Sequence, residues 1–258
     1  MPINDRPRVA VVTGGLSGIG RAIARRLAQG GMLVHVGARS ADDSARRAAF
    51  EAEFGDSVAF GRLDVRDTES CSRFVQSVIA QRGRVDILVN AAGVYEEAEV
   101  IGHSDRIWNE TLDTNLTGTF KMIREVMPLM KAQGWGRIVN IASVAAHQGM
   151  AANAAYCASK AGLLGLGRCV SLEGAAHGIT CTSISPTWVE TEMLRKFIDD
   201  EVAAGAPRAE VVAKYEASNP QGKLVQPEEI AELAAFLVSD AARAITMEDV
   251  QVNAGSLW

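Results

Sequence analysis

The stretch that most restricts the fold of this chain is a glycine-rich segment between a short apolar run and a helical pattern. Residues 9–12 are all apolar and lead directly into Thr13-Gly14-Gly15-Leu16-Ser17-Gly18-Ile19-Gly20, and apolar residues then recur at helical spacing as far as Gly30. A strand, a tight glycine turn and a helix in this order predict the first unit of a dinucleotide-binding sheet. The glycines allow close backbone approach, and the helix N-terminus offers N–H groups and a positive dipole to a pyrophosphate.

The alternation of short apolar runs with helical patterns continues to the end of the chain. Further buried strands are expected at 33–37, 58–63, 85–89, 137–141, 179–184 and 251–252. This alternation predicts a Rossmann-type doubly wound α/β fold, with a parallel sheet and helices on both faces. At 258 residues, the chain fits this fold as a single dinucleotide-binding catalytic domain, 1–258.

A second stretch, 143–160, holds the residues from which chemistry is expected. Ser143 follows a buried run and should lie just beyond the carboxyl end of that strand. Tyr156 and Lys160 are four residues apart and share one helix face if a helix begins near Ala154. A phenol ionises near ~10 in water, and a nearby ammonium lowers its pKa. Such a pair also arises by chance on helix surfaces. Beside a hydride carrier, however, it predicts a proton-transfer site for a carbonyl/alcohol pair.

The end of the second strand indicates which dinucleotide is bound. Dinucleotide sites often place an acid there, about 20 residues beyond the glycines, to bind the ribose 2′-hydroxyl. This chain has Ala38 followed by Arg39, and a guanidinium can hold a 2′-phosphate by two hydrogen bonds. NADP(H) is therefore favoured over NAD(H), unless Arg39 is only a solvated loop charge. After the third strand, Asp64-Val65 supplies either a carboxylate for the adenine amino group or a simple turn residue.

Two further segments supply candidate site residues. The fourth strand ends in Asn90-Ala91-Ala92-Gly93, whose small residues let the backbone pass close to a flat ligand. Asn115 lies among apolar residues of a helix expected over 104–130, and a buried amide needs partners. It is either a satisfied core residue or part of the site.

A long excursion after the sixth strand predicts a substrate lid at about 187–222. Roughly thirty residues separate this strand from the helix that starts at Pro227, and the carboxyl ends of parallel strands are where a lid would cover a ligand. The apolar candidates for its inner face are Trp188, Met193, Leu194 and Phe197. The expected substrate residues are Ser143, His147, Gln148, Trp188 and Met193. His147 and Gln148 suit a polar substrate, whereas Trp188 and Met193 suit an apolar or aromatic one.

The composition argues against several classes of protein. The formal net charge is −5 and the pI is about 5.5, whereas a nucleic-acid-binding protein would usually carry a basic patch. No run approaches the ~18 apolar residues of a membrane span, and residues 1–8 hold no apolar run for a signal peptide. The four cysteines are scattered, with no Cys-x-x-Cys pair, which indicates reduced thiols in a cytoplasmic protein and no metal site.

In combination and in order, these motifs resemble those of the short-chain dehydrogenase/reductase family. The matching elements are Thr13-Gly14-x-x-x-Gly18-Ile19-Gly20, Asn90-Ala91-Ala92-Gly93, Ser143, Tyr156-x-x-x-Lys160 and Pro186. The resemblance implies a seven-stranded parallel sheet with helices on both faces. It also implies a homotetramer whose interfaces use the helices that carry Asn115 and Tyr156, together with the C-terminal strand region. Stretches 136–143 and 224–229 are similar to those of 3-oxoacyl reductases, including polyketide ketoreductases.

The resemblance also implies roles for individual residues. Tyr156 would be the acid/base, and Lys160 would lower its pKa and bind the nicotinamide ribose. Ser143 would orient the substrate carbonyl, and Asn115 would hold a water in a proton relay behind Lys160. With the residues inferred above, the expected cofactor-binding set is Gly14, Ser17, Gly18, Ile19, Gly20, Arg39, Asp64, Val65, Asn90, Ala91, Gly93, Tyr156, Lys160, Pro186, Val189 and Thr191.

Three positions depart from the family pattern. Thr187 stands where a glycine usually follows the proline, which restricts the backbone beside the nicotinamide. Asn253-Ala254-Gly255 replaces Asp-Gly-Gly after the last strand, and Ser17 stands where NADP-preferring members often carry Lys or Arg.

The resulting hypothesis is an NAD(P)-dependent oxidoreductase that transfers a hydride between the cofactor and a ketone or secondary alcohol, of the 3-oxoacyl reductase type or a related carbonyl reductase. The alternative enzyme is an NAD-dependent polyol, sugar or hydroxy-acid dehydrogenase. A non-catalytic nucleotide sensor on the same fold should tolerate loss of the tetrad Asn115, Ser143, Tyr156 and Lys160, yet all four are present. The expected partner is a small-molecule carbonyl or alcohol substrate, with no nucleic acid and no membrane.

Overall fold

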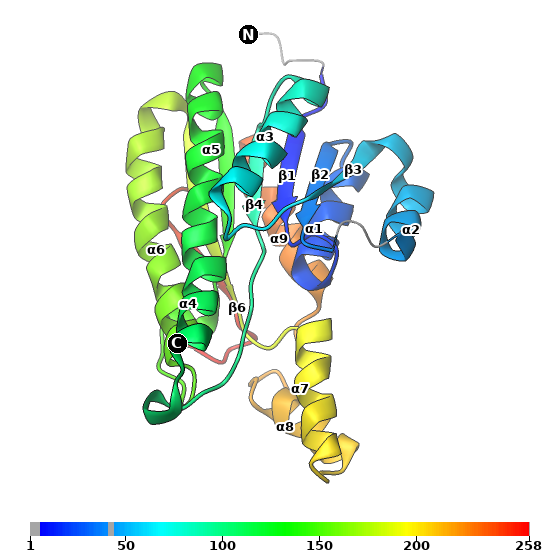
Figure 1. The fold of residues 1–258 in the computed structure, drawn as a ribbon, viewed down its shortest axis with the longest axis vertical. Coiled ribbons are helices and arrows are strands. Elements are labelled where there is room, and N and C mark those ends of the chain that lie inside the picture. The colour runs from blue at the N-terminus through cyan, green and yellow to red at the C-terminus, as the bar shows by residue number, and fades with distance from the viewer. Residues whose placement is uncertain (1–5, 41–43, 258) are drawn as a thin grey trace.

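The described residues, 6–40 and 44–257, form the doubly wound α/β fold expected from the sequence. In this computed structural model, seven strands of the described chain pair as one parallel sheet in the order β3-β2-β1-β4-β5-β6-β7 (Figure 1). The strand order reverses between β1 and β4, so a ligand crevice is expected at their carboxyl ends. The strands are β1 (Val9–Thr13), β2 (Leu33–Ala38), β3 (Val58–Arg62), β4 (Ile87–Asn90), β5 (Gly136–Ile141), β6 (Ile179–Pro186) and β7 (Asp249–Val252).

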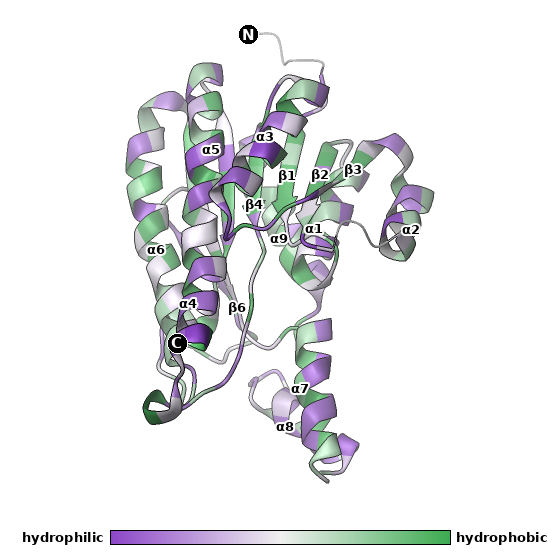
Figure 2. Ribbon diagram, in the orientation of Figure 1, coloured by the Kyte–Doolittle hydropathy of each residue, from purple (hydrophilic) through white to green (hydrophobic). Residues whose placement is uncertain are grey.

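Helices cover both faces of the sheet, which explains why the central strands are apolar along their whole length. Buried side chains of α1 and α9 pack on one face, and those of α3, α5 and α6 pack on the other. Figure 2 shows apolar strands between helices that alternate hydrophobic and hydrophilic stripes. The helices are α1 (Gly18–Gln29), α2 (Ser44–Phe54), α3 (Thr68–Arg82), α4 (Asp105–Leu112), α5 (Gly118–Gln133), α6 (Ala154–Gly174), α7 (Glu192–Ala203), α8 (Arg208–Ala217) and α9 (Pro227–Leu237).

The helix expected over 104–130 is not one regular helix. A π-helical turn (Asp113–Thr117) separates α4 from α5, and Asn115 lies in this turn. Its carbonyl accepts a hydrogen bond from the Thr119 hydroxyl at 3.0 Å. Single π turns inside helices are rare and often occur at functional sites.

The chain between β6 and α9 leaves the sheet as a small helical unit, which we call the lid segment (188–225). Its helices α7 and α8 project from one end of the molecule (Figure 1). Its stems lie side by side, because Val189 pairs with Val225, and the Val225 N–H donates to the Trp188 carbonyl at 3.1 Å. Its helices share a small core of their own: Leu194, Ile198, Val211 and Tyr215.

The sequence also led to expectations about membrane spans, a signal peptide and the cysteines. No helix within 6–40 and 44–257 is both long and apolar enough to cross a membrane. Residues 1–5, part of the polar start in which no signal peptide is expected, lie outside the described residues. All four cysteines are free thiols.

Candidate functional site

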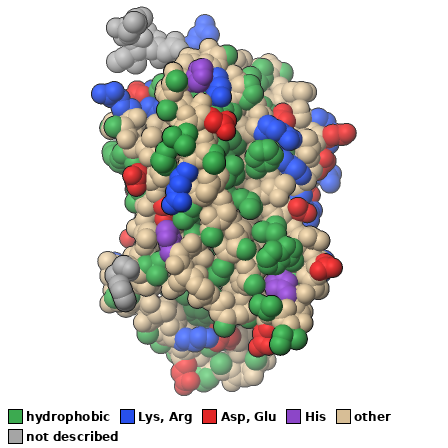
Figure 3. All heavy atoms as spheres, turned by 90° about the vertical axis from the view of Figure 1, so that its left-hand side faces the viewer, with side chains coloured by type: hydrophobic (Ala, Val, Ile, Leu, Met, Phe, Trp, Pro, Cys, Tyr) green, Lys and Arg blue, Asp and Glu red, His purple; other side chains and the backbone are tan. Residues whose placement is uncertain are grey.

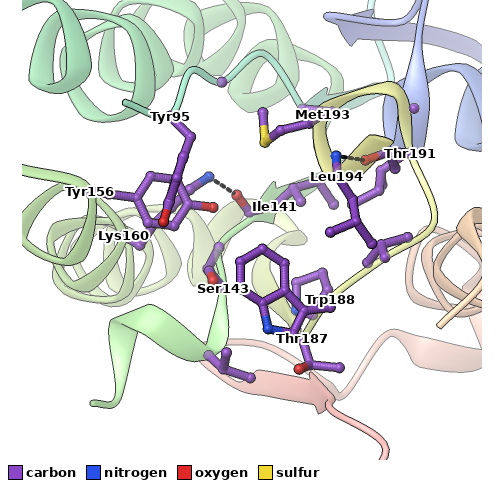
Figure 4. Close-up of a pocket in the computed structure, with 18 of the residues that line it drawn as sticks. Tyr95, Ile141, Ser143, Tyr156, Lys160, Thr187, Trp188, Thr191, Met193 and Leu194 are labelled. Atoms are coloured by element: carbon purple, nitrogen blue, oxygen red, sulfur yellow. Dashed lines mark hydrogen bonds between the residues drawn. The ribbon is translucent and has the colours of Figure 1, made fainter. Parts of the chain in front are cut away.

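The carboxyl ends of β1, β4, β5 and β6 open onto a cavity of about 480 Å³, and the lid segment lines its far side. Figure 4 shows Ser143, Tyr156 and Lys160 on one wall, with Trp188 and Met193 of the lid segment across from them. A ligand held here meets polar groups on the side of the sheet and apolar groups on the side of the lid.

The glycine turn lies so close to the neighbouring loop that side chains are excluded. Gly14 has a φ of +67°, and a Cβ built there would lie 2.8 Å from Ala92 Cα. A Cβ at Gly20 would lie 2.6 Å from the Gly14 carbonyl oxygen. Ser17 is the N-cap residue of α1, but its side chain makes no cap hydrogen bond. The first N–H groups of α1 therefore remain available to an anion at this end of the cavity.

Ser143 and Tyr156 meet on the wall formed by β5 and α6. Ser143 is buried and caps a short 3₁₀ turn, and its Oγ accepts a hydrogen bond from the Ala145 N–H at 3.1 Å. Burial raises the pKa of Tyr156 to about 12, although a hydrogen bond with Ser143 acts in the opposite direction. The phenol is therefore in its protonated form at neutral pH.

Lys160 shares the helix face of Tyr156, as expected from their spacing. Its Nζ lies 5.5 Å from the Tyr156 ring centroid and donates to the Ile141 carbonyl at 2.7 Å. Burial lowers the pKa of Lys160 to about 8.

The shift at Tyr156 is opposite to the lowering expected from Lys160. Burial disfavours the charged forms of both Tyr156 and Lys160, so it raises the pKa of the first and lowers that of the second. The Lys160 ammonium also donates to the Ile141 carbonyl and not to the Tyr156 hydroxyl.

Asn115 lies behind this wall and joins it to the loop after β4. Its Oδ1 accepts from the Val94 N–H at 2.8 Å, and its Nδ2 donates to the Val94 carbonyl and to Ser159 Oγ at 3.0 and 3.1 Å. A Cβ at Gly93 would lie 3.5 Å from Asn115 Oδ1 and 3.8 Å from Lys160 Nζ. Asn115 is thus a satisfied buried amide and a neighbour of the site at once.

Most of the expected cofactor residues line the cavity: Gly14, Ser17, Gly18, Ile19, Gly20, Ala91, Gly93, Tyr156, Lys160, Pro186, Val189 and Thr191. Arg39, Asp64, Val65 and Asn90 do not line it. Val65 and Asn90 are buried, and Asn90 Nδ2 donates to Asn140 Oδ1 at 2.9 Å.

The Asp64 carboxylate, expected to meet an adenine amino group, forms an ion pair with Arg66. Arg66 Nε and one of its terminal nitrogens donate to the two carboxylate oxygens at 2.9 and 2.7 Å. These bonds hold the pKa of Asp64 below its usual value, and the charge of Arg39 adds to the effect. Arg39 is exposed at the end of β2, on the surface beside this pair.

The substrate residues inferred from the sequence divide into two groups. Gln148, Trp188 and Met193 line the cavity together with Ser143. His147 does not, because its ring is hydrogen-bonded to Asp249 at 2.7 Å. The expectation that His147 contacts substrate is therefore not supported by its position.

Tyr95 lines the cavity and was not anticipated from the sequence. Its ring packs edge-on against Tyr156 and Phe197, with centroids 4.8 Å apart in both pairs. Trp188 extends the aromatic contacts to Phe197 and Tyr215 within the lid segment. The only sequence signal for Tyr95 is its place two residues after Gly93, where the chain leaves β4 over the cavity.

Two departures from the family pattern have visible consequences. Thr187 Oγ1 donates to Asn219 Oδ1 at 2.9 Å, which ties the end of β6 to the lid segment. Ala254 has a φ of +47°, in the left-handed region that favours glycine.

The chain is similar along almost its whole length to several known reductases. A family model described as enoyl-(acyl carrier protein) reductase matches residues 14–256. The chain is 39% identical to a putative ketoacyl reductase of the monensin polyketide synthase from Streptomyces virginiae, over 96% of both chains. It is 36% identical to the 3-oxoacyl-(acyl-carrier-protein) reductase FabG of Escherichia coli, over 98% of both. A crystal structure of a variant actinorhodin polyketide ketoreductase with NADPH matches with a TM-score of 0.92 and 36% identity, over 99% of both chains.

Proposed function

Because the chain belongs to the short-chain dehydrogenase/reductase family, we propose that it is an NADPH-dependent reductase of ketones of the 3-oxoacyl type. The observation that carries this proposal is the meeting of Ser143, Tyr156 and Lys160 in one cavity that ends at the glycine turn. Polar donors for a carbonyl oxygen and a cradle for a dinucleotide therefore share one site.

The cavity suits a dinucleotide by its backbone as well as its side chains. No side chain fits at Gly14 or Gly20, and the N-terminus of α1 would hold the pyrophosphate. Arg39, exposed beside Asp64 and Arg66, would hold a 2′-phosphate. The likeness to a structure determined with NADPH supports NADP(H) over NAD(H).

The chain's own residues handle the substrate oxygen and its proton. Bound NADPH supplies the hydride. Tyr156, protonated because its pKa is about 12, donates a proton to the carbonyl oxygen. Ser143 is a second, preorganised donor to the same oxygen as negative charge develops on it. Lys160 lies behind Tyr156, where its ammonium would return a proton to the phenolate, and Asn115 would hold a water that connects Lys160 to solvent.

The substrate class follows from the relatives and from the cavity wall. Curated relatives are named 3-oxoacyl-(acyl-carrier-protein) reductase and, in Shinella zoogloeoides, acetoacetyl-CoA reductase, at 36% and 38% identity. The lid segment presents Trp188, Met193 and Phe197, which suit the acyl part of such a substrate. A polyol or sugar dehydrogenase would need more hydrogen-bonding groups on this side, so that alternative has less support.

Conversion of Tyr156 to Phe tests the proposed reaction. Removal of the proton donor should lower kcat for NADPH-dependent reduction of an acetoacetyl thioester by ~10²–10⁴-fold. The affinity for NADPH, measured by fluorescence titration, should stay close to that of the wild type. Tyr95→Phe is the matched control, because it removes a hydroxyl from the neighbouring ring. Near wild-type turnover of Tyr156→Phe would refute the role of Tyr156.

We also propose that the protein is a cytoplasmic homotetramer. Free cysteines support a reducing compartment. Phe120 on α5 and Leu172 on α6 are exposed large apolar residues, at 44% and 70% exposure. These helices are the ones that the family resemblance places in subunit interfaces. Figure 3 views this side of the molecule and shows several hydrophobic side chains at its surface.

A further inference from the structure

Three side chains that have no part in the proposed reaction form a hydrogen-bonded array behind the cavity. The Asp249 carboxylate accepts from Ser185 Oγ at Oδ1 (2.8 Å) and binds the His147 ring through Oδ2 (2.7 Å). An ionised carboxylate only accepts, so His147 Nε2 carries the hydrogen of the second bond. Ser185 is fully buried, and the side chains of Asp249 and His147 are 14% and 27% exposed. None of the three lines the cavity.

Two members of the array lie next in the chain to residues of the cavity wall. His147 ends the short 3₁₀ turn that Ser143 caps, and Gln148 follows it. Ser185 directly precedes Pro186, which lines the cavity from β6. The Asp249 carboxylate therefore bridges the segment that presents Ser143 and the strand that presents Pro186.

The His147 end of the array lies beyond the backbone pairing of β5, whereas Ser185 and Asp249 lie on the paired strands β6 and β7. The last backbone bond from β5 to β6 runs from the Ala142 N–H to the Ile184 carbonyl at 2.8 Å. Ser143 and its turn lie beyond that bond. The His147–Asp249 bond ties the far end of the turn to β7, so the turn is held at both ends.

We propose that His147, Asp249 and Ser185 are positioning residues that fix Ser143 relative to β6. This inference rests on the proposed carbonyl reduction, in which Ser143 must meet the substrate oxygen as charge develops. A misplacement of about 1 Å in such a site can cost ~10²-fold in rate. The array is one of several constraints on the turn, so its loss should cost roughly ten-fold.

The array is tested by Asp249→Ala in two backgrounds. In the otherwise wild-type enzyme, kcat for an acetoacetyl thioester should fall roughly ten-fold, while the Kd for NADPH stays unchanged. In a Ser143→Ala background, Asp249→Ala should cause no further loss, because the group that it positions is absent. Asp249→Asn keeps an acceptor for Ser185 and should recover part of the rate. Glu248→Gln, which removes a charge from the exposed neighbour, is the control and should leave kcat unchanged.

A spectroscopic measurement tests the array without turnover. ¹⁵N shifts of the His147 imidazole in the protein alone should show hydrogen on Nε2 in the wild type and a mixture of tautomers in Asp249→Ala. The proposal is overturned if Asp249→Ala keeps full kcat, or if it lowers kcat equally with and without Ser143. A wild-type protein that does not reduce the thioester would instead contradict the proposed function, and the ¹⁵N measurement would still report on the array.

Discussion

Burial changes the proton affinity of several side chains in this molecule. Tyr156 and Lys160 shift in opposite directions, to pKa values of about 12 and about 8, because burial disfavours a charge of either sign. His35 on β2, which does not line the cavity, follows the same rule. It is 3% exposed, and its Nε2 lies 3.2 Å from Arg82 Nε, which donates to it. A ring nitrogen that accepts in this way carries no proton.

This state of His35 predicts acid sensitivity of the fold. Burial and the charge of Arg82 lower the pKa of His35 to about 4, from 6.5. The neutral His35 ring therefore stabilises the fold fully above pH 6.5, the pKa of the unfolded chain. This stabilisation is lost as the pH falls toward 4, because the unfolded chain binds the proton first. The shift corresponds to about 3 kcal/mol. His35→Gln, which can still accept from Arg82, should lose less unfolding free energy over this range in urea titrations. The exposed His177→Gln should behave like the wild type, and parallel curves for all three proteins would contradict the prediction.

At the residue scale, the sequence predicted the polar residues of the cavity wall better than the residues around them. Tyr156, Lys160 and Ser143 could be named because their spacing and position after a strand follow from backbone geometry. The place of His147 outside the cavity lining could not be predicted, because its partner, Asp249, is 102 residues away and gives no local signal. Tyr95 was missed because a loop residue's direction depends on tertiary packing.

At the scale of elements, glycine positions and apolar runs predicted most helices and strands. Two features of the backbone were not predictable: the π turn at Asn115 and the left-handed conformation of Ala254. The π turn at Asn115 has the same apolar periodicity as a regular helix. The left-handed backbone at Ala254 is set by the tail's contacts, since alanine itself disfavours that region.

Ala254 offers a test of local strain. At a φ of +47°, the alanine Cβ crowds the neighbouring carbonyl, whereas glycine adopts this conformation freely. Ala254→Gly should raise the free energy of unfolding by up to about 1 kcal/mol, after the added freedom of the unfolded chain is subtracted. Ala204→Gly, at an exposed site with a φ of −76°, is the control and should destabilise the protein. Equal effects of the two changes in chemical denaturation would contradict this account.

At the scale of the whole molecule, the sheet and its two helical layers follow directly from alternating strands and helices. The position of the lid segment was also predictable, because a long insertion at the carboxyl ends of the strands has no place in the sheet. The direction in which its side chains point was not, since its small core decides which of them face the cavity.

The proposed tetramer predicts that charge on α6 separates the subunits. Leu172 is 70% exposed, and an acid there would be buried at the cost of its hydration if α6 lies in an interface. Leu172→Glu should lower the mass measured by light scattering from that of a tetramer. Glu173→Gln alters the adjacent exposed residue and should leave the mass unchanged. A wild-type protein whose mass by light scattering is that of a monomer would refute the proposal.

The paired stems of the lid segment have a consequence for how this scaffold diversifies. Trp188 and Val225 lie side by side, so the chain leaves the sheet and returns to it at nearly the same point. A stretch with adjacent ends and its own apolar centre can be lengthened, shortened or exchanged by recombination with little effect on the strands beneath. Substrate range can therefore evolve in one interchangeable segment, while the sheet and the cavity wall that carries Tyr156 stay unchanged.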